Sequence, residues 1–274
     1  MVLLCSSGTH HLSAGTPPKA GRRVSLPADP LFYLLAAVAV ILVGLGKGGF
    51  SGLGSASMPV MTLAIDPISG AAILLPLFIV QDAVGVWSFR RSVDWRMLGW
   101  TLPGCALGIF LGWLLASSVA VWVVEAAVGA IALVFGANQL ATRSGAGVKL
   151  GKPQPDALGL FWGGLSGFTS QVALAGGPPF QIWAQSRKMS RDVFVGTNAL
   201  FFATSNWLKV PAFVALGQFS LLNTVLSGIF LPLAIASTVA GVWLVRRVAP
   251  ERFVAIINLL MIAVGLKLLW SALT

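Results

Sequence analysis

Residues 31–59 read LFYLLAAVAVILVGLGKGGFSGLGSASMP, a continuous apolar run that passes into a Gly- and Ser-rich stretch ending at Pro59. The apolar part, residues 31–46, approaches the roughly 20 residues with which an α-helix crosses a bilayer. More runs of this kind follow, at residues 68–89, 97–116, 119–140, 193–213, 219–245 and 253–272. The chain is therefore predicted to cross a membrane several times.

The composition of the 274 residues agrees with a membrane environment. Charged residues make up 9% of the chain and hydrophobic residues 57%, whereas soluble domains carry roughly a quarter charged residues. Backbone N–H and C=O groups in lipid must bond within their own segment, so the apolar runs are predicted to be helices. A transmembrane β-barrel would show alternating strands of about 10 residues, and the sequence has no such pattern.

The net charge of +10 does not indicate a nucleic-acid-binding protein, because the basic residues lie in short loops between apolar runs. This is the pattern of the positive-inside rule, so membrane lipids and not nucleic acid are the expected surroundings. Residues 1–29 form a tail rich in Ser, Gly, Pro and Thr without a signal-peptide pattern. The tail is predicted to be disordered.

The chain has the pattern of a duplication. A second Gly- and Pro-rich break, GFTSQVALAGGPP at residues 167–179, corresponds to the break that ends at Pro59. The fourth element of each half also carries Leu-Pro and then small residues four apart, a spacing that lets membrane helices pack closely. These residues are Leu102, Pro103, Gly108 and Gly112 in the first half and Leu231, Pro232, Ser237 and Gly241 in the second.

Equivalent loops of the two halves differ in charge. The pairs, with the basic loop first, are residues 90–96 and 216–218, residues 187–191 and 66–67, and residues 246–252 and 117–118. By the positive-inside rule, the halves are predicted to lie upside down relative to each other, with the basic loops in the cytoplasm and both termini outside. Lys19, Arg22 and Arg23 of the tail oppose this orientation.

These features predict an all-α integral membrane protein, a polytopic helical bundle of about 8–10 transmembrane or re-entrant helices in two inverted-topology repeats with broken helices. The predicted organisation is a disordered polar tail (residues 1–29), a first transmembrane repeat (30–140), a cytoplasmic linker (141–157) and a second transmembrane repeat (158–274). We expect a multi-pass protein of the cell inner membrane. A homodimer is compatible with the sequence.

The two breaks are the expected substrate site, because inverted repeats with broken helices bind their substrate where the repeats meet. Glycine permits close backbone approach. Pro59, Pro178 and Pro179 are expected to head half-helices whose free N–H groups attract an anion. For any single residue, the alternative is that the glycines and amides only pack the helices together.

Basic and polar residues complete the candidate site. Lys47 lies deep in the first span, where a charge costs at least about 3 kcal/mol, so we expect it to bind the substrate unless it snorkels to the membrane surface. Asp82 is a candidate coupling or proton-carrying residue, or a partner for a lysine. One face of the helix predicted at residues 193–213 carries Asn198, Phe202, Asn206 and Lys209. The candidate substrate-binding residues are Lys47, Gly48, Gly49, Ser55, Ser57, Thr169, Ser170, Gln171, Gly176, Gly177, Gln181, Asn198, Asn206 and Lys209.

Sequence motifs of other functional classes do not occur. His, Cys and Glu residues show no metal-ligand spacing, and neither a Gly-x-Ser-x-Gly elbow nor a Walker loop is present. We therefore expect no catalytic residue, no metal, no cofactor and no ATP-driven transport by this chain alone.

Short motifs throughout the chain resemble those of the TauE/SafE sulfite exporter family, and the resemblance runs from about residue 31 to the end. The motifs are LGKGGF at 45–50 with Pro59, LP at 75–76 with Asp82, DWR at 94–96, AGGPP at 175–179, FVGT at 194–197, FF at 201–202 with NWLK at 206–209, and LGQ at 216–218. The resemblance implies a permease for sulfur-containing anions, such as sulfite or an organosulfonate, without an ATPase subunit.

Two positions near the expected site depart from the family pattern. Leu174 stands where many relatives have His, and Gln171 stands where an apolar residue is common. These differences leave the identity of the anion open. A permease for a carboxylate or another small solute is the alternative within the same class, and an intramembrane enzyme is the less favoured alternative from another class.

Overall fold

The computed structural model describes residues 26–50, 52–116, 118, 120–143, 155–187, 189–245, 247 and 251–273. These residues form α-helices, one 3-10 helix and connecting turns, with no strand among them. The predicted all-α class is therefore confirmed. Most of the predicted tail (1–29) and of the predicted linker (141–157) lies outside the described residues, as does Lys188.

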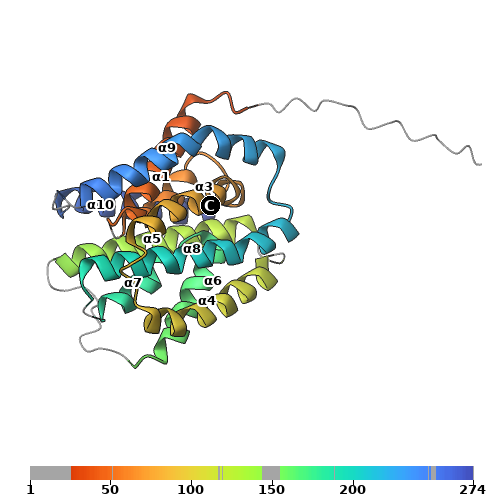
Figure 1. Cartoon of the computed structure of the whole chain (residues 1–274). Coiled ribbons are helices and arrows are strands. Elements are labelled where there is room, and N and C mark those ends of the chain that lie inside the picture. The colour runs from red at the N-terminus through yellow and green to blue at the C-terminus, as the bar shows by residue number, and fades with distance from the viewer. Residues whose placement is uncertain are drawn as a thin grey trace, which may run out of the picture.

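The helices fall into two series along the chain (Figure 1). The first series is α1 (Pro30–Lys47), the 3-10 helix η1 (Leu53–Ala56), α2 (Ser57–Met61), α3 (Pro67–Phe89), α4 (Trp95–Ala116) and α5 (Val121–Arg143). The second is α6 (Leu158–Ala173), α7 (Gly177–Gln185), α8 (Arg191–Ala215), α9 (Leu221–Val245) and α10 (Glu251–Leu273). Each of the seven predicted apolar runs corresponds to a helix, but α5 begins at Val121 and α9 begins at Leu221, each two residues after the predicted start of its run.

Local sequence explains where two of the spans begin. Asp29 and Asp66 are N-caps that accept hydrogen bonds of 2.9 Å from the backbone N–H groups of Leu31 and Ser69. Each aspartate is followed by a proline at the first helical position, where the missing N–H has no partner to lose. The Asp-Pro pairs therefore fix the starts of α1 and α3.

Five of the described helices are long and apolar enough to cross a membrane, namely α1, α3, α4, α5 and α9. Large apolar side chains such as Leu34, Trp87, Val134 and Phe161 are exposed on the bundle surface. Such a surface is stable in contact with lipid and unstable in water. The chain is a multi-pass membrane protein.

The principal helix contacts join the two series. α1 packs against α9 on one flank and α4 against α6 on the other, while α3 and α8 lie between the flanks and contact each other (Figure 1). α5 packs against α10. Exchanging each helix for its counterpart in the other series reproduces this pattern, because α1–α9 becomes α6–α4 and α3–α9 becomes α8–α4.

Small residues make the two flanking contacts close. A Cβ atom on Gly241 of α9 would lie 3.0 Å from the carbonyl oxygen of Gly44 on α1. On the other flank, a Cβ on Gly108 of α4 would lie 2.0 Å from the carbonyl oxygen of Gly164 on α6. The predicted packing role of the small residues in the fourth elements is confirmed at these positions.

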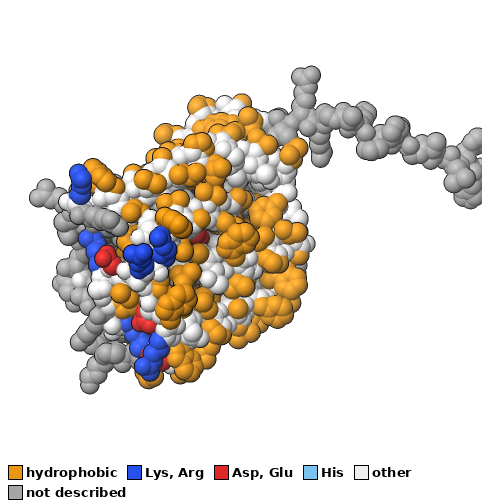
Figure 2. All heavy atoms as spheres, viewed as in Figure 1, with side chains coloured by type: hydrophobic (Ala, Val, Ile, Leu, Met, Phe, Trp, Pro, Cys, Tyr) orange, Lys and Arg blue, Asp and Glu red, His pale blue; other side chains and the backbone are white. Residues whose placement is uncertain are grey.

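Basic loops gather at one end of the bundle. Arg96 in the first turn of α4 and Arg187 after α7 both pair with Asp156 before α6. The Arg96 Nε lies 2.6 Å from Asp156 Oδ2. Lys and Arg side chains collect at this end beside a broad hydrophobic surface (Figure 2). The connection at residues 216–220 lies at the opposite end, because the 25 residues of α8 separate it from the basic loop before that helix (Figure 1).

Candidate functional site

Both predicted breaks are present, and each one reverses the direction of the chain. α1 ends at Lys47, and the chain then turns through Gly49 (φ 122°) and Gly52 (φ 93°), backbone conformations that favour glycine. η1 and α2 return along α1. In the second half α6 ends at Ala173, and α7 packs back against α6.

The first half-helix begins before the predicted proline. α2 starts at Ser57, directly after η1, so Pro59 is its third residue and does not head the helix. This position is tolerated because the N–H groups of the first turn have no partner within the helix. The second half-helix starts at Gly177, with Pro178 and Pro179 following in its first turn.

The turn between α6 and α7 contains a leucine in a strained backbone conformation. Leu174 has φ 49° and ψ 26°, a left-handed conformation that is costly for a residue with a Cβ atom. Its N–H bonds to the carbonyl oxygen of Ser170 at 3.1 Å, and its side chain is buried against the core.

The two breaks meet inside the bundle. A Cβ atom placed on Gly177 would lie 2.7 Å from Ser55 Oγ, so the start of α7 and the 3-10 helix of the first half are in direct contact. Beside this contact lies a partly enclosed cavity of about 80 Å³. A water molecule needs about 10–15 Å³ of such space. The cavity therefore has room for several waters or one small ion.

The cavity is lined by residues of both halves. They are Val43, Gly46, Lys47, Gly52, Gly54, Ser55, Phe78, Asp82, Ser170, Leu174, Gly177, Gln181, Asn198, Ala199, Phe202, Asn206 and Lys209.

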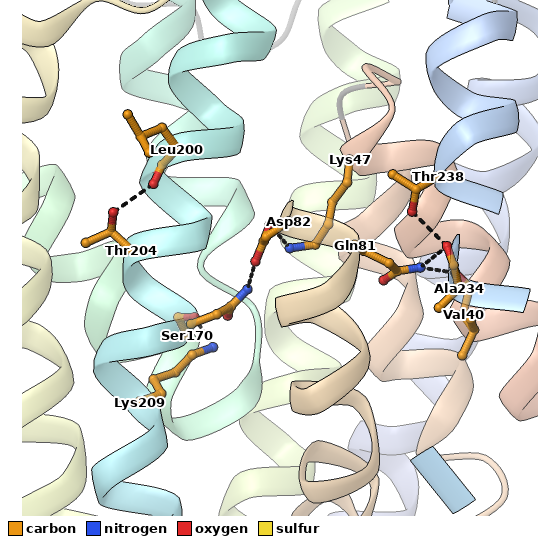
Figure 3. Close-up of polar contacts among 11 residues, drawn as sticks. Val40, Lys47, Gln81, Asp82, Ser170, Leu200, Thr204, Lys209, Ala234 and Thr238 are labelled. Atoms are coloured by element: carbon orange, nitrogen blue, oxygen red, sulfur yellow. Dashed lines mark hydrogen bonds and ion pairs between the residues drawn. The ribbon is translucent and has the colours of Figure 1, made fainter. Parts of the chain in front are cut away.

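Asp82 is the acidic residue of the cavity wall, and both of its carboxylate oxygens have partners. Lys47 Nζ forms an ion pair with Oδ1, and Asn206 Nδ2 donates to Oδ2 at 2.5 Å (Figure 3). The Phe78 ring centroid lies 5.1 Å from Lys47 Nζ. Asp82 is 2% exposed. The sequence left Asp82 as a proton carrier or a lysine partner, and the structure makes it the partner of Lys47.

The residue before Asp82 on α3 helps to fix Asp82 in place. Gln81 Nε2 donates to the backbone oxygens of Val40 on α1, at 3.1 Å, and Ala234 on α9, at 3.4 Å (Figure 3). These bonds tie α3 to both neighbouring helices on the side away from the cavity. Asp82 is thus held on a helix anchored across the two halves.

Lys209 is the second cation of the cavity. Its side chain is fully buried on α8, and Nζ donates to Ser170 Oγ on α6 at 2.9 Å (Figure 3). Among the residues that the structure describes, no carboxylate lies within ion-pair distance of this nitrogen. A hydroxyl group accepts a hydrogen bond but carries no charge, so the ammonium is solvated without being neutralised.

Neutral polar groups complete the wall. The predicted face of α8 is confirmed, because Asn198, Phe202, Asn206 and Lys209 all line the cavity. The Asn198 Oδ1 and Gln181 Oε1 atoms have no hydrogen-bond partner among the described residues. The oxygen and nitrogen of such amides are assigned by their bonding partners. A bound anion would turn the NH₂ group of either residue toward itself.

Nine of the residues selected from the sequence line the cavity. They are Lys47, Ser55, Asp82, Ser170, Gly177, Gln181, Asn198, Asn206 and Lys209. Six others lie outside its wall, namely Gly48, Gly49, Ser57, Thr169, Gln171 and Gly176.

Local contacts explain several of these outer positions. A Cβ on Gly48 would lie 2.5 Å from the backbone of Gly241, so Gly48 serves helix packing. Ser57 and Thr169 donate to backbone oxygens of their own segments, at 2.7 and 2.8 Å. Gln171 is buried beside Gly112 on α4. Their contribution to substrate binding stays a prediction.

The sequence reasoning missed Phe78, which lines the cavity below Lys47. Phe78 lies four residues before Asp82, a spacing that places the two side chains on one helix face. From this spacing, Phe78 could have been selected as a candidate site residue together with Asp82. Gly46, Gly52 and Gly54 of the first break also line the cavity and were not selected individually.

A comparison with protein families matches the chain to the sulfite exporter TauE/SafE family over residues 35–268. The chain belongs to this family. The match includes both breaks and every residue that lines the cavity. Membership of the TauE/SafE family indicates a membrane transporter. The comparison with curated proteins gave no match, and neither did the comparison with solved structures.

Proposed function

We propose that the chain is a secondary transporter that moves a small sulfur-containing anion, such as sulfite or an organosulfonate, across the cell inner membrane by alternating access. The anion class is inferred from the family, and the binding site is inferred from the cavity. On this reading the chain performs no catalysis.

The observation that carries the proposal is the charge of the cavity wall. Lys47 and Lys209 face it together with the single carboxylate of Asp82, so two cations against one anion leave a net charge of +1. A buried charge is costly unless it is compensated. Lys209 has no carboxylate beside it in the described part of the chain, and a bound anion would supply the missing negative charge.

The rest of the wall suits the same ligand. Ser55, Ser170, Gln181, Asn198 and Asn206 carry hydroxyl or amide groups that can donate hydrogen bonds to anionic oxygens. The volume of about 80 Å³ favours an ion of a few atoms over a large organic solute. Donors and size together support sulfite or a short-chain sulfonate.

The arrangement of helices supports alternating access. The cavity lies where residues of the two halves meet, and the principal helix pairs recur when the halves are exchanged. The loop after α3 lies at the basic end, whereas its counterpart after α8 lies at the other end (Figure 1). Two halves related in this way could rock around the cavity and expose it to either side in turn.

The test is transport of radiolabelled sulfite by the purified full-length protein in proteoliposomes, without ATP and with the membrane potential clamped. We expect saturable flux down the sulfite gradient, and competition by methanesulfonate but not by acetate. Protein-free liposomes and liposomes with the Lys209→Met variant provide the background. Flux of acetate without flux of sulfite would support a carboxylate permease instead, and absence of flux for every anion tested would overturn the proposal.

A further inference from the structure

Asp82 gives the two cavity lysines, Lys47 and Lys209, different electrostatic environments. Its carboxylate pairs with Lys47 on one oxygen and accepts a hydrogen bond from Asn206 on the other. The charge of Lys47 is thereby compensated by a residue of the protein itself. Lys209 bonds only to the Ser170 hydroxyl among the described residues. One positive charge is satisfied, and one is left for a ligand.

We propose that Asp82 determines the charge of the anion that the cavity accepts, selecting a monoanion over a dianion of the same size. This inference rests on the proposed function and adds to it the charge class of the substrate. A monoanion beside Lys209 brings the net charge of the lining residues and ligand to zero. A dianion leaves one negative charge that nothing in the described wall compensates.

The position of Asp82 strengthens this selection. Asp82 lines the same small cavity as Lys209, so a bound dianion would lie close to a carboxylate of like charge. Like charges repel strongly in a poorly hydrated interior. The carboxylate is also held by Lys47, Asn206 and the anchored helix α3, so it is not free to turn away. Asp82 therefore opposes a second negative charge at a fixed place.

A simpler role for the Asp82–Lys47 pair would be to hold the helices in place, with neither charge acting on the bound anion. In that case, removing the Asp82 charge would change the stability of the protein without changing the relative affinity for monoanions and dianions. Variants that change the net charge of the cavity separate the two roles. The cavity has a net charge of +1 in the wild type, +2 in Asp82→Asn, and +1 again in the double variant Lys47→Met/Asp82→Asn.

The experiment measures the affinity of the full-length protein in detergent for methanesulfonate and for sulfate. These probes share a tetrahedral shape and the number of non-hydrogen atoms but differ by one charge, and neither changes charge near neutral pH as sulfite does. Titration calorimetry is run on the wild type, on both variants and on Asp156→Asn. The last variant makes the same substitution at an acidic residue outside the cavity.

We expect the wild type to bind methanesulfonate at least about tenfold more tightly than sulfate, which corresponds to about 1.4 kcal/mol. Asp82→Asn should gain at least about tenfold in sulfate affinity and lose the preference. The double variant should regain the preference for the monoanion, and Asp156→Asn should keep it. If Asp82→Asn alone does not fold, the wild type and the double variant still test the inference, because a preference for sulfate in either one would overturn it.

Three results would contradict the inference. A wild type that binds both probes equally, an Asp82→Asn variant that keeps the wild-type preference, or a double variant that prefers sulfate would each overturn it and leave the proposed transport function standing. A wild type that binds neither probe would count against the proposed function itself.

Discussion

Lys209 Nζ on α8 lies 2.9 Å from Ser170 Oγ on α6, and the lysine side chain is buried. The other cavity lysine, Lys47, pairs with Asp82 instead. Each half of the chain thus supplies one lysine to the same cavity, but only the lysine of the first half has a carboxylate partner. This difference leads to opposite expectations for the two lysines when each is replaced.

Replacing Lys209 should improve stability and abolish function. Lys209→Met removes a buried charge that has no carboxylate partner among the described residues, and such a removal is expected to raise the unfolding temperature. The same change removes the uncompensated positive charge, so anion affinity should fall by roughly 10- to 100-fold, or about 1.4 to 2.7 kcal/mol. Thermal unfolding and sulfite binding are measured on the same preparation.

Two other lysine variants serve as controls for this experiment. Lys267→Met replaces an exposed lysine near the end of α10 and should leave binding unchanged. Lys47→Met leaves the buried Asp82 without its ion-pair partner and should lower the unfolding temperature. A Lys209→Met protein with wild-type affinity would show that Lys209 does not hold the anion.

The contact between the two breaks should be sensitive to a single methyl group. Gly177→Ala places a Cβ atom 2.7 Å from Ser55 Oγ, closer than real side-chain contacts allow, so the two breaks must move apart or Ser55 must turn into the cavity. Sulfite transport should fall at least about tenfold. The larger Gly177→Leu change should abolish transport while the protein remains folded in the membrane.

A second substitution tests the cause of that loss. Ser55→Gly removes the hydroxyl that the new methyl group meets, so the double variant Ser55→Gly/Gly177→Ala should transport better than Gly177→Ala alone. Transport rates are compared at equal protein density in proteoliposomes. If the double variant is no better than the single one, the clash with Ser55 is not the reason for the loss.

The ion pairs of Asp156 at the basic end should make stability depend on pH. The hydrogen bond from Arg187, with the charges of Arg187 and Arg96, holds the pKa of Asp156 below the ordinary value of an aspartate carboxyl. The group therefore stabilises the folded protein above about pH 4, and this contribution is lost as the pH falls through the lowered pKa. Asp156→Asn should have a slightly lower unfolding temperature than the wild type at pH 7.

The difference between wild type and Asp156→Asn should be smaller at pH 3 than at pH 7, because the carboxylate becomes protonated as the pH falls through its lowered pKa. Thermal unfolding in detergent at the two pH values measures it. Adding Arg96→Gln to Asp156→Asn provides the control, because an arginine without its partner has little left to contribute. An equal difference at both pH values would show that the carboxylate charge does not stabilise this end.

The orientation of the halves can be tested by labelling introduced cysteines from each side of the membrane. Cysteines at Arg91, Gly147, Lys188 and Arg247 should react only from the cytoplasm, because they lie in the basic loops. Cysteines at Ser118 and Gly217 should react only from outside. Labelling of Arg91 and Lys188 from opposite sides would exclude the inverted arrangement.

The sequence predicted most of the fold, because each feature that it used is local. An apolar run of bilayer length must become a helix wherever it lies, since its backbone has no other hydrogen-bond partners in lipid. The Gly- and Pro-rich breaks act within a few residues of themselves, and they indicated where the chain leaves α1 and α6. The spacing of Asn198, Phe202, Asn206 and Lys209 also sufficed to define one functional face of α8, because a regular helix fixes which of its own residues share a side.

The tertiary structure alone decided which of these residues act together. Glycines of the same break separate into Gly48, which packs against α9, and Gly52, which lines the cavity, because helix rotation and neighbouring helices determine what each backbone atom meets. The sequence favoured Lys47 as the cation for the substrate, but Asp82 reaches Lys47 across 35 residues of chain. Lys209 remains without a carboxylate in the described structure. Electrostatic pairing depends on distance in space, which no local pattern of the sequence specifies.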